Sequence, residues 1–306
     1  MRQAMHLGAE RVIYSFSARH APALEVPSGA VIAVQTRDAY DGRFGRDRDI
    51  QAYLKDPGRG ASNPATGPVA VRNVQPGDGL DVRIEEVSLE GTGFVAVLPG
   101  IGVLGDLAVP PRLVAFQVRP DGLWTESGLR LPLRPMIGTI GVAPASGEIP
   151  TKDLGYHGGN LDCNDIAPGT TIHFPVQVPG GMLALGDVHA SMGFGEVFSG
   201  VNIGATVTLG VRRVERAPWR RPWFETDKEV MTLGVEDTLE QAIRQATLGM
   251  TEVLGERLGV SLAEAIALTG AACDVRLGQA SKFGVKVSAY AVFPKSALGG
   301  PARSGT

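Results

Sequence analysis

Short alternating apolar runs, separated by turns that contain Gly or Pro, dominate the first two thirds of the chain. Residues 23–38 and 67–90 each carry a strand pattern, a turn of the Pro-Ser-Gly or Pro-Gly-Asp kind, and a second strand pattern. The apolar positions Leu80, Val82, Ile84 and Val87 nearly alternate, as they do in a half-buried strand. No helical period is sustained between residues 11 and 214. The pattern predicts a mainly β protein with a β-sandwich or barrel-like body.

The pattern changes near residues 215–225. Residues 235–259 place apolar side chains at helical spacing, with Asp237 or Thr238 available as the N-cap and Gly259 at the end. Ser261 and Glu264 form a capping box ahead of a second helix, and residues 285–295 alternate as a closing strand. We therefore predict a β-rich body over residues 1–215, which carries the site, and an α+β C-terminal segment over residues 216–306.

Composition narrows the class of protein. The 306 residues are 43% hydrophobic and 20% charged, with a net charge of −3, which is typical of a globular chain without a basic surface for nucleic acid. The longest apolar runs are too short to span a bilayer, and the N-terminal residues lack the apolar core of a signal peptide. We expect a cytoplasmic protein that binds neither nucleic acid nor membrane.

Three polar residues stand out in the glycine-rich stretch 186–196: Asp187, His189 and Glu196. If the stretch begins as a strand end, the first two side chains project from the same face, because side chains alternate along a strand. A carboxylate and an imidazole in that arrangement can supply two ligands to one ion. The alternative is three polar residues in a surface loop, and the spacing alone does not decide between the two.

A second polar cluster lies in residues 156–170. It contains His157, Asn160, Asp162, Asn164 and Asp165 beside two glycines. Such residues suit a cation, but they also form turns in which the side chains bond their own backbone. Asp38, which follows a predicted strand, has the same two interpretations, with turn former the more ordinary one.

Cys163 opens a further alternative. It lies inside the second cluster, and a thiol can act as a nucleophile where a base such as His157 raises its thiolate fraction. A structural cysteine beside a metal-binding loop accounts for the position equally well.

Taken together, these motifs resemble those of the acetamidase/formamidase family. The resemblance covers nearly the whole chain and is carried by segments in family order, of which the most specific are HGGNLDCNDI (157–166) and GDVHASMG (186–193); the others include NPATGPVAVRNVQPGD (63–78), PMIGTIGVAP (135–144) and DTLEQAIRQAT (237–247). It implies release of ammonia from a short aliphatic amide, a β-sandwich-like body and a homodimer. It also implies a divalent metal, zinc in the first place, with calcium as a candidate second ion.

The resemblance implies a site made up of Asp38, His157, Asn160, Asp162, Asp187, His189 and Glu196. Within this set we expect His157, Asp162, His189 and Asp38 to bind the metal, and Glu196, Asn160 and Asp187 to be catalytic, with Asp187 as an alternative third ligand. Glu196 is expected to act as general base and acid, and Asn160 to donate to the oxyanion. Phe194 and Asn202 stand where the family pattern tends to have acidic residues. A protein that binds a metal or a small molecule without turnover is therefore the alternative to an amidase.

Overall fold

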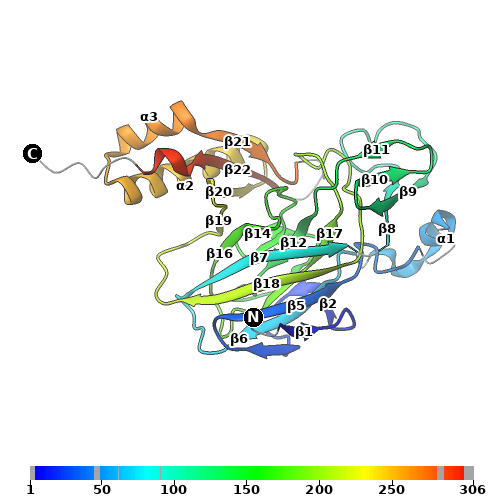
Figure 1. Cartoon of the computed structure of the whole chain (residues 1–306), viewed down its shortest axis with the longest axis horizontal. Helices are drawn as coiled ribbons and strands as arrows, with labels where there is room; N and C mark the ends of the chain where they lie inside the picture. The colour runs from blue at the N-terminus through cyan, green and yellow to red at the C-terminus, as the bar shows by residue number, and fades with distance from the viewer. Residues whose placement is uncertain (1–3, 45–48, 61, 90, 281–285, 300–306) are drawn as a thin grey trace, which may run out of the picture.

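The computed structural model describes residues 4–44, 49–60, 62–89, 91–280 and 286–299. β-Sheets form the body, and the helices of the C-terminal segment lie at one end of it (Figure 1). The prediction of a mainly β body followed by an α+β C-terminal segment is confirmed.

The larger sheet has nine strands and runs through both parts of the chain. In spatial order its strands are β1 (Met5–Leu7), β5 (Ala30–Thr36), β18 (Ala205–Val214), β7 (Gly79–Leu89), β16 (Thr171–Pro175), β19 (Trp223–Glu225), β20 (Glu229–Glu236), β22 (Val287–Pro294) and β21 (Asp274–Leu277). The predicted boundary near residue 215 lies between β18 and β19 along the chain, and both of these strands belong to this sheet. Division of the chain there into two domains stays a prediction.

The second sheet carries most of the candidate site. Its seven strands are β14 (Leu154–Gly155), β15 (Gly158–Asn160), β12 (Met136–Gly141), β17 (Leu183–His189), β6 (Ala65–Val71) and β2 (Val12–Ile13) in order, with β4 (Leu24–Val26) parallel to β6. The apolar faces of the two large sheets meet in one core that includes Val34, Ile84, Ile137 and Leu185, all of them fully buried.

The turns at residues 27–29 and 72–78 carry the chain from one sheet to the other. β4 and β6 belong to the seven-stranded sheet, whereas β5 and β7, which follow them, belong to the nine-stranded sheet. Between β16 and β17 the chain crosses in the opposite direction, from the nine-stranded sheet to the seven-stranded sheet. The strands and turns were predictable from local pattern, but the pairing is between strands distant in sequence.

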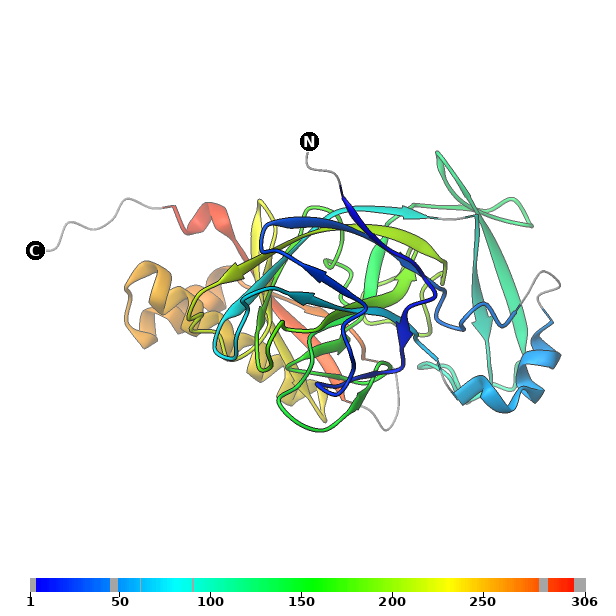
Figure 2. The same ribbon diagram turned by 90° about the horizontal axis from the view of Figure 1, so that it is seen from below.

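A smaller sheet and a short helix lie at the other end of the body from the C-terminal helices (Figure 2). The sheet contains β8 (Thr92–Val97), β9 (Arg112–Arg119), β10 (Gly122–Thr125) and β11 (Arg130–Leu131), while β3 (Ser15–Phe16) pairs with β13 (Ile149–Pro150) elsewhere. The helix α1 (Ile50–Lys55) and the 3₁₀ turn η1 (Pro57–Gly60) were not predicted. Asp49 caps α1, which has only six residues and so shows no sustained period.

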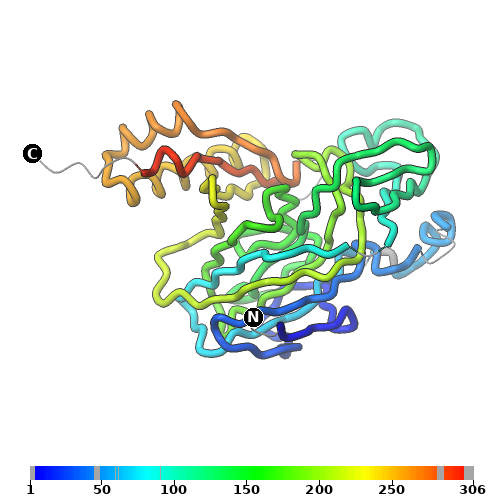
Figure 3. The backbone as a smooth tube through the Cα atoms, in the orientation of Figure 1, coloured from blue at the N-terminus to red at the C-terminus, as the bar shows by residue number. Residues whose placement is uncertain are grey.

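The C-terminal helices begin and end as predicted. α2 (Leu239–Leu258) has Thr238 as its N-cap, and Gly259 ends it in the left-handed conformation at φ 64°. α3 (Leu262–Ala272) begins with the capping box of Ser261 and Glu264. The chain then returns through β21 and β22 to η2 (Lys295–Ala297), which lies beside the helices at the end of the molecule away from the small sheet (Figure 3). Among the described residues no helix is both long enough and apolar enough to cross a bilayer.

Candidate active site

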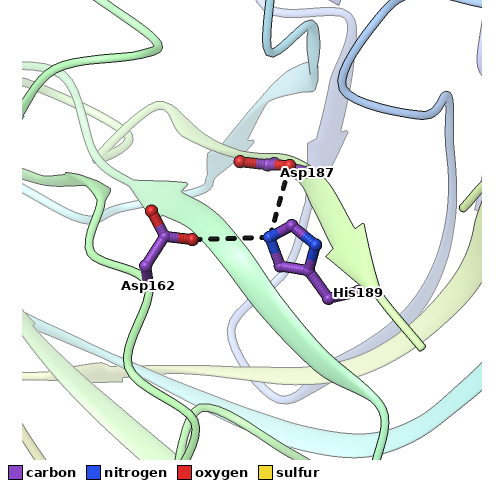
Figure 4. Close-up of side chains that lie close together, drawn as sticks. All are labelled: Asp162, Asp187 and His189. Atoms are coloured by element: carbon purple, nitrogen blue, oxygen red, sulfur yellow. Dashed lines mark ion pairs between the residues drawn. The ribbon is translucent and has the colours of Figure 1, made fainter. Parts of the chain in front are cut away.

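Asp162, Asp187 and His189 meet between β17 and the segment that follows β15. Nε2 of His189 lies 3.5 Å from Oδ1 of Asp162 and 3.5 Å from Oδ1 of Asp187 (Figure 4). The three ligand atoms are all within 4.8 Å of one another, and the three residues are buried. We refer to these residues as the carboxylate–histidine group. Asp187 and His189 share β17, whereas Asp162 approaches from a different part of the chain.

Amide side chains hold the second oxygen of Asp162. Asn160 Nδ2 donates to Oδ2 at 2.9 Å, and Gln279 Nε2 donates to the same atom at 3.0 Å. Gln279 follows β21, so the C-terminal segment contributes directly to the site. These bonds turn Oδ1 of Asp162 toward His189.

Asn63 performs the same task for Asp187. Its Nδ2 donates to Asp187 Oδ2 at 2.7 Å and also to Asn160 Oδ1 at 2.8 Å. Asn160 Oδ1 accepts a second hydrogen bond, of 2.7 Å, from the hydroxyl of Thr139. One buried network of neutral donors therefore orients both carboxylates, the arrangement that fixes ligand geometry around metal ions.

Backbone strain is concentrated at the site. Asp162, Asp187 and Glu196 have φ values of 47°, 52° and 37°, in the left-handed region that residues with a Cβ rarely adopt. Each such residue costs of order 1–3 kcal/mol and persists only where the surrounding structure holds it in place, commonly at functional sites.

Gly138 leaves the space in which the ligand atoms face one another. β12 pairs Ile137 with Val188 and Thr139 with Gly186, which places Gly138 opposite Asp187. A Cβ on Gly138 would lie 2.7 Å from Asp162 Oδ1 and 3.1 Å from His189 Nε2. Any larger residue here would intrude on the carboxylate–histidine group.

The donor set and its spacing fit a divalent metal ion. Two buried carboxylates side by side are costly in a medium of low dielectric constant, and a cation would offset that cost. Ligands at about 2.1 Å from a tetrahedral zinc ion are about 3.4 Å apart, close to the 3.5 Å between His189 Nε2 and each Oδ1 atom. Calcium would require six to eight oxygen ligands, more than this group offers.

Tyr40 lies within electrostatic range of both Asp187 and Glu196. Glu196 is buried at 4% exposure on a turn after β17. Burial raises the pKa of Tyr40, and the charges of Tyr53, Asp187 and Glu196 raise it further. Two contacts help to position Tyr40. The backbone of the preceding residue, Ala39, accepts a hydrogen bond from the backbone of Asn63, and the ring of Tyr40 lies 5.8 Å from the ring of Phe94.

His157 lies outside the carboxylate–histidine group. It occupies the two-residue turn between β14 and β15, and its ring packs edge-on against Phe16 with the centroids 5.0 Å apart. Its nitrogens are not among the ligand atoms within 4.8 Å of one another. This corrects the expectation that His157 and His189 bind one ion. Gly158 and Gly159, at φ 98° and 89°, redirect the chain between His157 and Asp162.

Asp38 is also outside the group and forms a turn. Its Oδ1 accepts from the backbone nitrogen of Tyr40 at 2.8 Å, and its Oδ2 from that of Gly42 at 3.0 Å. Burial raises the pKa of Asp38, and the two backbone hydrogen bonds offset only part of that increase because they favour the ionised carboxylate. The structure therefore does not bring Asp38 into the carboxylate–histidine group, and both its oxygens accept from the backbone of their own loop.

The role expected of Asn160 changes as well. Its Oδ1 accepts from Asn63 and Thr139, and its Nδ2 donates to Asp162. These contacts make Asn160 a positioning residue for Asp162 rather than a free oxyanion donor.

The environment of Cys163 does not favour a nucleophilic thiol. The side chain is fully buried and its Sγ lies 3.5 Å from the carbonyl oxygen of Leu161. Burial raises its pKa, and the charges of Asp162 and Asp165 raise it further, so the thiolate fraction at neutral pH is small.

The two positions that depart from the family pattern do not fill the space between the ligand atoms. Phe194 is 47% exposed, and its ring lies 5.8 Å from the guanidinium carbon of Arg276. The side chain of Asn202 donates to Ser199 Oγ at 3.1 Å and to the carbonyl oxygen of Gly200 at 3.2 Å. Its backbone bridges Phe94 on one side and His189 on the other.

Sequence reasoning missed four residues of this site: Asn63, Thr139, Gln279 and Tyr40. Asn63 and Thr139 do lie in the segments that resemble the family, 63–78 and 135–144. Their amide and hydroxyl groups carry no charge or cluster that would single them out, and their partners are distant in sequence.

The fold and the site thus define a mainly β protein with two large packed sheets and a buried carboxylate–histidine group. The model of the acetamidase/formamidase family matches residues 16–152 and 147–281. The chain belongs to this family.

Solved structures resemble nearly the whole chain, among them the following two. One, titled acetamidase, from Bacillus halodurans, is 34% identical with a TM-score of 0.90, and the match covers 97% of this chain and 100% of that one. A predicted acetamidase/formamidase from Thermoanaerobacter tengcongensis is 32% identical with a TM-score of 0.90, covering 97% and 98%. An acetamidase of Mycolicibacterium smegmatis is 24% identical over 242 residues, which are 57% of this chain and 58% of that protein.

Proposed function

We propose that the protein is an amidase that hydrolyses short aliphatic amides, of the formamide and acetamide kind, to ammonia and a carboxylate. Family membership supports the reaction class. The observation that carries the proposal is the buried carboxylate–histidine group, whose three ligand atoms lie within 4.8 Å of one another. The ligand set in this proposal is Asp162, Asp187 and His189, with zinc as the metal.

Amides react slowly because resonance weakens the carbonyl carbon as an electrophile and the nitrogen leaves poorly. When bound, a zinc ion would supply a water molecule of lowered pKa and polarise the carbonyl. Asn63, Asn160 and Gln279 donate to the Oδ2 atoms of the two aspartates, which would keep the Oδ1 atoms oriented toward the zinc ion.

Proton transfer is assigned to Glu196. It is a buried carboxylate close enough to Tyr40 for its charge to affect that hydroxyl. In this role Glu196 takes a proton from the attacking water and returns it to the leaving nitrogen. We propose that the hydroxyl of Tyr40 contacts the substrate next to Glu196.

Two alternatives make different predictions. A Cys163 thiol amidase would be inactivated by iodoacetamide and insensitive to a chelator; the buried thiol of raised pKa argues against it. A protein that binds metal or a small molecule without turnover would bind zinc and release no ammonia. Phe194 is exposed and Asn202 bonds Ser199 and Gly200, so neither side chain blocks the carboxylate–histidine group, and the replacement of the two acidic residues is the argument left for that alternative.

One assay distinguishes these functions. Ammonia release from formamide and acetamide is measured with the protein as purified, after chelator treatment, and after return of zinc. We expect release that the chelator abolishes and zinc restores. Glu196→Gln should lower kcat by about 10²–10⁴-fold with zinc content unchanged. Absence of release from every short amide tested, with zinc bound, would reject the amidase.

Two further expectations accompany the proposal. The homodimer and the cytoplasmic location implied by the sequence stay predictions. Light scattering of the purified protein tests the first, and fractionation of cells tests the second.

A further inference from the structure

The turn that carries Glu196 is held from the C-terminal segment. The backbone nitrogen of Gly195 donates to the carbonyl oxygen of Leu277, the last residue of β21, at 3.0 Å. Two positions further on, the side chain of Gln279 donates to Oδ2 of Asp162. One short stretch of chain therefore contacts both the turn of the proposed proton-transfer residue and the carboxylate–histidine group.

Arg276, which precedes Leu277, is fixed by two carboxylates. Its Nη1 and Nη2 atoms donate to the two carboxylate oxygens of Glu229 at 3.1 and 2.8 Å, and Nη1 also donates to Oδ2 of Asp165 at 2.9 Å. The hydroxyl of the fully buried Tyr290 donates to the same oxygen of Asp165 at 2.8 Å. A guanidinium bound in this bidentate way has a defined orientation, because its planar group matches the carboxylate along one edge.

Phe194 lies against the face of this guanidinium. The guanidinium carbon of Arg276 is 5.8 Å from the centroid of the Phe194 ring, within the distance of a cation–π contact. The ring is 47% exposed, so burial in a core does not fix its position. An aromatic ring uses the face of the cation, whereas an acidic residue, as in the family pattern, would compete with Glu229 and Asp165 for the terminal nitrogens.

Phe194 and Glu196 share one turn. The backbone nitrogen of Glu196 donates to the carbonyl oxygen of Gly193 at 3.3 Å, and Glu196 has a φ of 37°. A residue in this conformation stays there only where the surrounding structure holds it. We propose that Arg276 is a positioning residue for Glu196 and acts through Phe194, whose contact with the guanidinium keeps the turn in place for proton transfer. This inference rests on the proposed function, because the role of Glu196 does.

Kinetics of ammonia release from acetamide test the proposal with the full-length, zinc-loaded protein. Phe194→Leu should lower kcat about tenfold, because misplacement of a catalytic group by about 1 Å costs up to about 100-fold. KM, zinc content and melting temperature should not change. Phe194→Tyr keeps a ring that attracts a cation and should retain kcat within about twofold.

Val197→Ala is the matched control, since it shortens a 62% exposed apolar side chain of the same segment. It should leave kcat at the parent value. A parent kcat in Phe194→Leu, or equal losses in the leucine and tyrosine variants, would overturn the proposal.

A double-mutant cycle assigns the effect to the pair. In an Arg276→Gln background, Phe194→Leu should cause no further loss of kcat, because its partner is already absent. A further loss as large as in the parent would show that Phe194 acts independently of Arg276 and would reject the proposal. If Arg276→Gln does not fold, the comparison of the leucine and tyrosine variants still decides.

Hydrogen exchange at the Gly195 amide separates this proposal from the amidase assignment. Because that amide bonds Leu277, it should exchange about two- to fivefold faster in Phe194→Leu, the factor expected for loss of a partly exposed cation–π contact. Exchange should stay unchanged in Phe194→Tyr and Val197→Ala. Absence of ammonia release from the parent protein counts against the proposed function, whereas unchanged exchange in Phe194→Leu counts against the role of Arg276.

Discussion

The side-chain amide of Asn63 donates a 2.7 Å hydrogen bond to Oδ2 of Asp187, across 124 positions of the chain. The donor comes from the segment before β6, and the acceptor is on β17, which pairs with β6. The same amide group bonds Asn160, so Asn63 links the supports of both aspartates. A residue outside the carboxylate–histidine group thereby helps to decide where the carboxylates of Asp187 and Asp162 point.

Replacement of Asn63 tests this link. Asn63→Ala should weaken zinc binding by about 10–100-fold, because it removes the bond that orients Asp187. Competition with a chelating dye measures the affinity. Asn73→Ala is the matched control: both asparagines have positive φ, 54° and 63°, but Asn73 is exposed. Equal effects of the two variants would mean that backbone strain, not the hydrogen bond, matters.

Gly138 allows a steric test. Gly138→Ala places a Cβ 2.7 Å from Asp162 Oδ1, closer than van der Waals contact permits. We expect loss of stoichiometric zinc, measured by mass spectrometry of the metal, and loss of ammonia release. Gly193→Ala is the control, since a Cβ there meets nothing within 4 Å. Full zinc content in Gly138→Ala would show that the ion does not bind between these atoms.

Tyr40→Phe tests the proposed contact with substrate. Removal of one hydroxyl hydrogen bond should lower kcat/KM for acetamide roughly tenfold, about 1.4 kcal/mol, without change in zinc content. Tyr14→Phe is the control, because it removes a tyrosine hydroxyl that donates at 2.6 Å to Asp41, the residue after Tyr40. That control should leave kcat/KM near the parent value. If both variants fall alike, disturbance of the loop explains the loss.

A pH effect on stability is expected from His173, which lies on β16 of the nine-stranded sheet and outside the carboxylate–histidine group. Burial alone would lower its pKa, but Asp81, with Oδ1 at 2.7 Å from Nδ1, and Glu225 raise it. The charged ring therefore stabilises the folded state fully below about pH 6.5, the unfolded value, and this contribution is lost as pH rises through the raised folded value.

Urea unfolding between pH 5.5 and 9 measures this effect. The free energy of unfolding should fall as pH rises in this window, and His173→Gln should flatten the decline. His6→Gln, at an exposed position, is the control and should follow the parent curve. An unchanged slope in His173→Gln would show that another group is responsible.

Local pattern was enough to predict most elements. The caps at Thr238 and Ser261 and the end at Gly259 were recognisable because each involves residues within four positions of one another. The pair Asp187 and His189 was predictable for the same reason, since alternate residues of a strand share a face. α1 was missed because six residues are too few for a helical period.

What could not be predicted is which polar residues meet. His157 and Asp162 lie in one short motif, yet a hairpin turn and two glycines of positive φ separate them, and the ring of His157 packs against Phe16 instead. Asn63, Thr139 and Gln279 come from distant segments and join the site through sheet pairing and its register.

The sequence alone was therefore sufficient to predict most of the secondary structure, the family and the shared strand face of Asp187 and His189. Packing of the sheets decided the rest: the approach of Asp162, the space at Gly138 and the exclusion of Asp38. The physical reason is range, because propensity and capping act over a few residues, whereas the buried site is assembled by hydrogen bonds between strands that lie far apart along the chain.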